Sequence, residues 1–195
     1  MEIDIEELVP ETIAGYCGLL TPLIGYVLII ISIPMHRDFR LTKSSLSDLG
    51  EVGVAYNNVF NFALIVSGIL FLIFVLGMLR RTETRVGDIG IFGLAIGAIF
   101  LSLTGIFPKS TSPHMLIAVL FYSVSIGGLI LYGLDKFLEF EPVWAVLIWS
   151  SLGFTAIAIG LVSTLSPEGI AIYEIIGTIP MIQFSLVFGT HLLTE

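Results

Sequence analysis

Residues 36–61, HRDFRLTKSSLSDLGEVGVAYNNVFN, form the one long polar interval in a chain otherwise made of apolar stretches. This interval decides the fold because it divides the first hydrophobic stretch from the second, so the chain must leave the apolar phase here and return. No catalytic or ligand-binding motif occurs in it or elsewhere. Any chemistry of the protein is nevertheless expected to involve this interval, because the rest of the chain offers few polar groups.

The composition on either side of the interval identifies an integral membrane protein. Hydrophobic residues make up 56% of the 195 residues and charged residues only 12%, against about 25% charged in soluble proteins. The mean hydropathy is +1.02. A helix that crosses a bilayer needs about 20 apolar residues. The sequence contains six such stretches, and we predict an all-α polytopic bundle of six transmembrane helices forming one domain over 1–195, with spans at about 12–33, 56–79, 87–107, 113–133, 142–165 and 167–192.

Charge and cysteine content exclude several classes of partner and site. The net charge is −8, but the acidic residues crowd into short connections and the amino terminus, so the charge does not indicate a nucleic-acid partner. The single cysteine, Cys17, excludes an internal disulfide and a cysteine-rich metal site. We therefore predict no metal site and no cofactor, and we expect membrane lipids to be the surrounding partners.

A short helix is predicted inside the polar interval, between the first and second spans. Ser45 can cap its amino terminus, Asp48 follows three residues later as in a capping box, and Gly50 can close the turn. The leucines and valines of this segment are unusual for a fully solvated loop, so the helix should be interfacial or fold back over the bundle. We call residues 36–53 the lid and predict that it is ordered on the mouth of the bundle.

Small residues recur at helical spacing on two of the spans. Helices in lipid associate through close packing rather than through burial of leucine, so such faces are expected at helix contacts. They comprise Gly90, Gly93 and Gly97 on the third span, and Gly153, Ala156, Gly160 and Ser163 on the fifth.

Topology brings the polar residues of the chain to one end. Six spans place both termini on one side and the first, third and fifth connections on the other. A polar group left in hydrocarbon costs several kcal/mol, so the polar residues near these connections should converge on one polar pocket. The candidate ligand-binding residues are His36, Ser47, Asp48, Asn57, Asn61, His114 and Glu174.

Several of these elements together resemble the domain-of-unknown-function 998 family, which comprises six-span, largely archaeal, prokaryotic membrane proteins. The elements are Ser47-Asp48-Leu49-Gly50, the asparagines after it, Gly105-Ile-Phe-Pro108 followed by His114, and the glycine-rich last span with Glu174. The resemblance covers nearly the whole chain and implies the six-span fold, but it implies no activity. In the family a basic residue often follows the glutamate of the last span, whereas Ile175 follows Glu174 here.

The pattern favours a polar pocket that binds a lipid headgroup or a small amphiphile, and it leaves other functions open. Ser47 could act as the nucleophile of a lipid hydrolase with Asp48, His114 or Glu174. Glu174 could carry protons for a transporter. His36 and His114 with a carboxylate could bind a metal, although no H-E-x-x-H spacing supports this. The polar residues could also be purely structural, and no catalytic residue is assigned.

The number of basic residues is the same on the two sides of the membrane, so the orientation is predicted from where they lie. The termini side carries Arg80, Arg81, Arg85 and Lys136, and the opposite side carries Arg37, Arg40, Lys43 and Lys109. Three of the arginines on the termini side share one short turn at helix ends, where the positive-inside rule is strongest. We therefore predict a multi-pass protein of the cell membrane with cytoplasmic termini.

Overall fold

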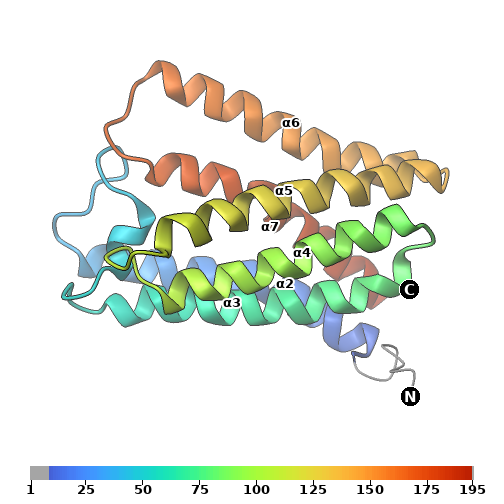
Figure 1. Cartoon of the computed structure of the whole chain (residues 1–195), viewed down its shortest axis with the longest axis horizontal. Helices are drawn as coiled ribbons and strands as arrows, with labels where there is room; N and C mark the ends of the chain where they lie inside the picture. Colours follow the sequence, from blue (N-terminus) through green and yellow to red (C-terminus); the bar gives the residue numbers. More distant parts are fainter. Residues whose placement is uncertain (1–8, 195) are drawn as a thin grey trace.

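The computed structural model describes residues 9–194 and confirms the predicted class of fold. Within these residues there are six helices long and apolar enough to cross a membrane, and no strand. They run back and forth along the long axis of the molecule, so both termini lie at one end, as Figure 1 shows. The helices are α2 (Glu11–Ser32), α3 (Asn57–Met78), α4 (Arg85–Ile106), α5 (His114–Leu138), α6 (Pro142–Thr164) and α7 (Ala171–Thr194).

Aromatic side chains fill the core near the termini. The ring of Phe184 on α7 lies 5.5 Å from that of Phe74 on α3 and 4.9 Å from that of Phe188, measured between centroids. Tyr132 on α5 stands edge-on to Phe184 and to Phe188 at 5.4 Å each. Such offset and edge-to-face pairs are the favoured geometries of aromatic rings. They join α3, α5 and α7 into one packed layer.

The small-residue face on the third span is a helix contact, as predicted. A Cβ atom added to Gly90 would lie 2.8 Å from the backbone nitrogen of Tyr132, and one added to Gly93 would lie 3.3 Å from Cα of Gly128. A side chain at Gly97 would meet Ser125. Glycine is therefore what allows α4 and α5 to approach closely.

The small-residue face on the fifth span is not a helix contact, so that prediction is wrong. A Cβ atom added to Gly153 or to Gly160 would meet no atom within 4 Å. All buried residues of α6 lie between Ala145 and Thr155, where Gln183 of α7 donates a hydrogen bond to the carbonyl of Leu147 at 3.0 Å. Beyond residue 155 the helix diverges from the bundle (Figure 1). The local pattern is the same on both spans, and only the position of the neighbouring helices differs.

The lid follows the 3-10 helix η1 (Ile33–Met35) and contains a second 3-10 helix, η2 (Leu46–Gly50). The five residues of η2 replace the short interfacial helix that the sequence predicted, and they pack on the bundle with Leu46 and Leu49 buried against α3. Two backbone bonds of 2.9 Å hold the lid to the start of α7, from the nitrogen of Gly169 to the carbonyl of Thr42 and from that of Ala171 to the carbonyl of Ser44. These two bonds fix the residues just before η2 against α7, and they hold the lid over one end of the bundle.

Candidate functional site

A cavity of about 120 Å³ lies inside the bundle, directly beneath the lid. We call it the central cavity. Residues of α2, α3, α4, α5, α7 and η2 line it, and α6 contributes none of the described lining residues. Its wall is mainly apolar, with a few polar side chains among the lining residues. The apolar part of the lining includes Ile29, Leu46, Phe60, Leu64, Phe71, Leu101, Phe121 and Met181.

Glu174 brings a carboxylate to the lid end of the central cavity. It lies in the first turn of α7, and its Oε2 accepts a hydrogen bond of 2.6 Å from the backbone nitrogen of Leu46 in the lid. Tyr122 on α5 donates its hydroxyl to the backbone carbonyl of Glu174 at 3.1 Å. The carboxylate therefore fastens the lid to α7 and also faces the cavity.

His114 supplies a second polar group at the same end. It is the first residue of α5, is 6% exposed, and lines the central cavity. Its Nδ1 lies 2.7 Å from the carbonyl oxygen of Phe107. Because a carbonyl can only accept, Nδ1 is the donor in this contact, and Nε2 is the ring nitrogen left for another partner.

Ser185 adds a polar group deep in the central cavity that the sequence analysis did not single out. Its side chain is 1% exposed, lines the cavity, and has no hydrogen-bond partner among the described residues. An unsatisfied buried hydroxyl costs about 1–3 kcal/mol. The spacing of Glu174, Thr178 and Ser185 at four and seven residues on α7 places them on one helical face. That spacing is the signal by which the sequence could have indicated Ser185.

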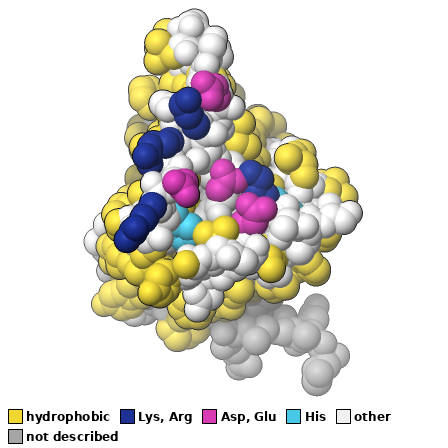
Figure 2. All heavy atoms as spheres, turned by 90° about the vertical axis from the view of Figure 1, so that its left-hand side faces the viewer, with side chains coloured by type: hydrophobic (Ala, Val, Ile, Leu, Met, Phe, Trp, Pro, Cys, Tyr) yellow, Lys and Arg dark blue, Asp and Glu magenta, His cyan; other side chains and the backbone are white. Residues whose placement is uncertain are grey.

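An ion pair on the outer surface of the lid clamps it to the connection between α4 and α5. Lys109 contacts the carboxylate of Asp48 and donates to Oγ of Ser45 at 3.0 Å, while Ser45 Oγ donates to Asp48 Oδ1 at 2.8 Å. Partial burial by itself would raise the pKa of Asp48, but the hydrogen bonds from Lys109 and Ser45 outweigh it and hold that pKa below its ordinary value. Charged side chains of both signs gather on this end of the molecule (Figure 2).

The structure brings only part of the predicted site together. Ser47, His114 and Glu174 line the central cavity. Asp48 and His36 instead line a separate hollow of about 340 Å³ on the outside of the lid.

The two asparagines do not reach the central cavity because they satisfy carbonyl groups of the lid. Asn57 Nδ2 donates to the carbonyl of Glu51 at 2.9 Å, and Asn61 Nδ2 donates to that of Gly50 at 3.0 Å. The lid ends here without regular structure, so its carbonyl groups need side-chain donors. The expected convergence thus holds for His114 and Glu174 and fails for Asp48, Asn57 and Asn61.

The groups proposed for catalysis are engaged with other partners. Oγ of Ser47 is 3.0 Å from Oγ of Ser45, and Nδ1 of His114 faces the carbonyl of Phe107 rather than a carboxylate. Within residues 9–194, Ser47 is therefore not hydrogen-bonded to a base as the nucleophile of a hydrolase is. In the same part of the chain, no group of three or more His, Cys, Asp or Glu side chains is placed to hold a metal ion.

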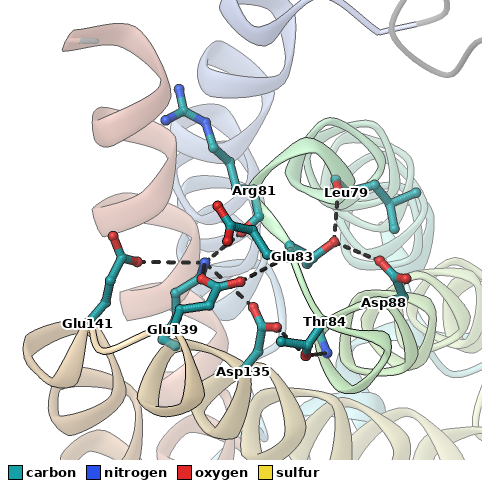
Figure 3. A network of polar contacts seen from close by, with 11 residues as sticks. Leu79, Arg81, Glu83, Thr84, Asp88, Asp135, Glu139 and Glu141 are labelled. Atoms are coloured by element: carbon teal, nitrogen blue, oxygen red, sulfur yellow. Dashed lines mark hydrogen bonds and ion pairs between the residues drawn. The ribbon is translucent and has the colours of Figure 1, made fainter.

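A second polar site lies at the end of the bundle that carries the termini, where the sequence predicted only turns. Lys136 on α5 is 5% exposed, and its ammonium donates to the carbonyl of Arg81 at 2.6 Å and contacts the carboxylate of Glu139. Asp135 is fully buried and accepts a hydrogen bond of 2.6 Å from Thr84 Oγ1. Figure 3 shows these groups pointing toward one another from α5, η3 (Leu79–Arg81) and the start of α4.

Six apolar helices around a covered cavity define a multi-pass helical membrane protein. Residues 19–191 match the family described as "Protein of unknown function (DUF998)", and the chain belongs to this family. Neither the curated proteins nor the solved structures contain a match to the chain.

Proposed function

We propose that the protein binds a small amphiphile in the central cavity, with the polar head beneath the lid and the apolar part between the helices. The observation that carries this proposal is the arrangement of a few polar groups in an otherwise apolar cavity beneath the lid. Glu174 and His114 stand at the lid end, and the unpartnered hydroxyl of Ser185 stands deeper in the same cavity. Ligand sites in proteins typically combine apolar walls with a few placed polar groups.

The polar groups at the lid end favour a head that donates hydrogen bonds. The carboxylate of Glu174 accepts hydrogen bonds, and Ser47 can accept as well as donate. An alcohol or an amine provides the complementary donors, whereas a carboxylate or phosphate would meet repulsion from Glu174. The ligand head is therefore a hydroxyl or amine group.

The size of the central cavity limits the length of the ligand. Its volume of about 120 Å³ lies below the range of about 300–1,000 Å³ that is usual for small-molecule sites. A lipid with two full acyl chains does not fit into this space. The space suits a short amphiphile, or the head and first carbons of a longer one whose remainder leaves between helices.

The lid controls access from the end opposite the termini. It is held by the bond from Leu46 to Glu174 on the inside, by the pair of Lys109 with Asp48 on the outside, and by the two backbone bonds to the start of α7. Opening this end requires these contacts to break. With the protein in the cell membrane and the arginine-rich turn at the termini in the cytoplasm, the lid faces outward.

Mass spectrometry of small molecules that co-purify with the detergent-extracted protein tests this proposal. Ser185→Ala should lower the amount of bound amphiphile at least severalfold, because it removes the polar group deep in the cavity. Ser163→Ala is the matched control: Ser163 is exposed on α6 and its hydroxyl bonds to its own helix at Gly160. Two results together would show that the polar groups are structural: the purified wild type carries no ligand, and Ser185→Ala raises the stability without any other effect.

A lipid hydrolase is the second candidate, because Ser47, His114 and Glu174 line the same cavity. A fluorophosphonate probe that forms a covalent bond with activated serines distinguishes it from a binding protein. Labelling of Ser47 that His114→Ala abolishes would establish the hydrolase. A binding protein leaves the probe unreacted while the amphiphile is still retained.

A further inference from the structure

A hollow of about 720 Å³ opens at the end of the bundle that carries the termini, and it has no role in the proposed function. We call it the termini hollow. Its volume lies within the range of about 300–1,000 Å³ that is usual for small-molecule sites. Phe188 of the aromatic core lines it, and it shares none of its described lining residues with the central cavity. Its lining consists of Glu11, Met78, Arg80, Arg81, Glu83, Tyr132, Lys136, Glu139, Glu141, Trp144, Phe188 and His191.

A buried hydroxyl in the termini hollow lacks a partner. Tyr132 is 0% exposed and lines the hollow, and its hydroxyl has no hydrogen-bond partner within residues 9–194. The edge-on contacts with Phe184 and Phe188 fix the ring, so the hydroxyl cannot turn away to reach another group. Buried tyrosine hydroxyls normally find a partner. A hydrogen-bonding ligand in the hollow would supply it.

The charges around the termini hollow leave one carboxylate in excess. Four glutamates line it against the three cations Arg80, Arg81 and Lys136. Glu11 pairs with Arg81 at 3.1 Å, and Glu139 accepts from Lys136 and from the backbone nitrogen of Glu83 at 2.8 Å. Glu141 is the least engaged of the carboxylates around Lys136, because its Oε2 lies 3.7 Å from that ammonium. The excess negative charge is therefore available at Glu141.

Aromatic rings complete an environment for a positive charge. The centroid of the Trp144 ring lies 5.1 Å from that of Phe188 and 4.7 Å from that of His191, and the rings are tilted by 42° and 45° to one another. The ammonium of Lys136 already lies 5.4 Å from the centre of the Tyr132 ring. Ammonium groups are attracted to the faces of aromatic rings. Trp144 and Phe188 line the same hollow and offer further aromatic surface to a second ammonium.

We infer that the termini hollow is a second binding site, which takes an organic ammonium ion between Glu141 and the aromatic rings. The ion donates an N–H to the hydroxyl oxygen of Tyr132, and its carbon chain lies against Met78 and Phe188. Because this bond requires an N–H, the site prefers a primary ammonium to a quaternary one. The ammonium belongs either to a free amine or to an amine-bearing lipid headgroup.

Calorimetric titration of the full-length protein in an uncharged detergent tests the inference. Butylammonium chloride should bind, tetramethylammonium should bind at least about fivefold more weakly, and butanol and butanoate should not bind. Glu141→Gln and Tyr132→Phe should each weaken butylammonium binding about tenfold. Glu168→Gln is the matched control, because that glutamate pairs with Lys43 at the opposite end of the molecule. Equal binding of butanol or butanoate, or no effect of Glu141→Gln, would overturn the inference.

The melting temperature separates loss of the site from loss of the fold. Tyr132→Phe removes a hydroxyl that bonds to nothing in the empty protein, so its melting temperature without amine should equal or exceed that of the wild type. A clear drop would show that the hydroxyl has a structural partner and would contradict the inference.

Lipid nanodiscs identify the source of the ammonium. If it belongs to a lipid, native mass spectrometry should show phosphatidylethanolamine, but not phosphatidylglycerol, retained by the wild type and lost from Glu141→Gln. If it belongs to a free amine, butylammonium should bind equally well in both kinds of nanodisc. If neither the lipid is retained nor butylammonium binds, the inferred ammonium site is wrong. The proposal for the central cavity does not depend on that result.

Discussion

The two ends of the bundle use polar residues in opposite ways. At the termini end, α6 packs against its neighbours and a buried lysine is surrounded by acidic residues from one helix and the following turn. At the lid end, α6 has left the bundle, and single polar groups from separate elements meet around an enclosed cavity. The ion pair at the lid end, between Lys109 and Asp48, lies on the surface with both side chains partly exposed.

This difference separates a rigid end from an end that can open. A buried ion network is costly to disrupt, because removal of one charge leaves the others without compensation. Surface ion pairs contribute little. We therefore expect the termini end to hold the helices together and the lid end to admit a ligand, and four measurements can break or sharpen this contrast.

The largest expected effect comes from Lys136→Met. It leaves the buried Asp135 and Glu139 without their cation, which should lower the free energy of unfolding by about 3–5 kcal/mol. Lys109→Met is the matched control at the lid end, where the 43% exposed side chain should cost no more than about 1 kcal/mol. Chemical denaturation in detergent measures both. Similar losses for the two variants would contradict the contrast.

The next effect concerns the packing of α4 and α6. Gly90→Ala places a Cβ atom 2.8 Å from backbone of α5 near the termini end, which should destabilise the protein by about 1–3 kcal/mol. Gly160→Ala, in the half of α6 that leaves the bundle, meets nothing and should be neutral or stabilising by up to about 1 kcal/mol. Thermal melting of the two variants gives the comparison. Destabilisation by Gly160→Ala would show that this face is packed in the membrane.

A smaller effect is expected from Glu174→Gln. The amide can still accept from the nitrogen of Leu46, but the bond loses its charge assistance and about 1 kcal/mol. Amide hydrogen exchange should therefore quicken severalfold across Leu46–Gly50 and stay unchanged in α3. Equally slow exchange in the variant would show that Glu174 does not fasten the lid.

The smallest effect is the response of the lid to acid. The pKa of Asp48 is lowered in the folded protein, so its contribution is fully present above its ordinary value of about 3.9 and is lost as the pH falls through the lowered value. Between pH 6 and pH 3 the melting temperature of the wild type should fall slightly more than that of Asp48→Asn. Asp38→Asn, on the same lid, serves as the control and should follow the wild type. Identical pH profiles for the wild type and Asp48→Asn would show that the ion pair of Asp48 with Lys109 does not stabilise the folded protein.

The sequence by itself determined the class of the fold. It also determined that two residues of the candidate site, His114 and Glu174, lie at the same end of the bundle. Hydrophobicity and length are local properties, and a membrane leaves little choice but helices, so six spans followed directly. The number of spans then placed His114 and Glu174 at one end. The bond from Ser45 to Asp48 was also predictable, because a capping box joins residues only three positions apart.

Only the tertiary structure decided which polar groups meet and where space remains. A cavity is the volume that side chains from several elements fail to fill, so no single segment encodes it. The amides of Asn57 and Asn61 could have faced a pocket or bonded to backbone carbonyls. They bond to carbonyls at the irregular end of the lid. Gly90 and Gly160 belong to the same kind of local pattern, yet one touches a helix and the other touches nothing. Contact between elements far apart in the chain depends on the positions of both, and that information lies in neither segment alone.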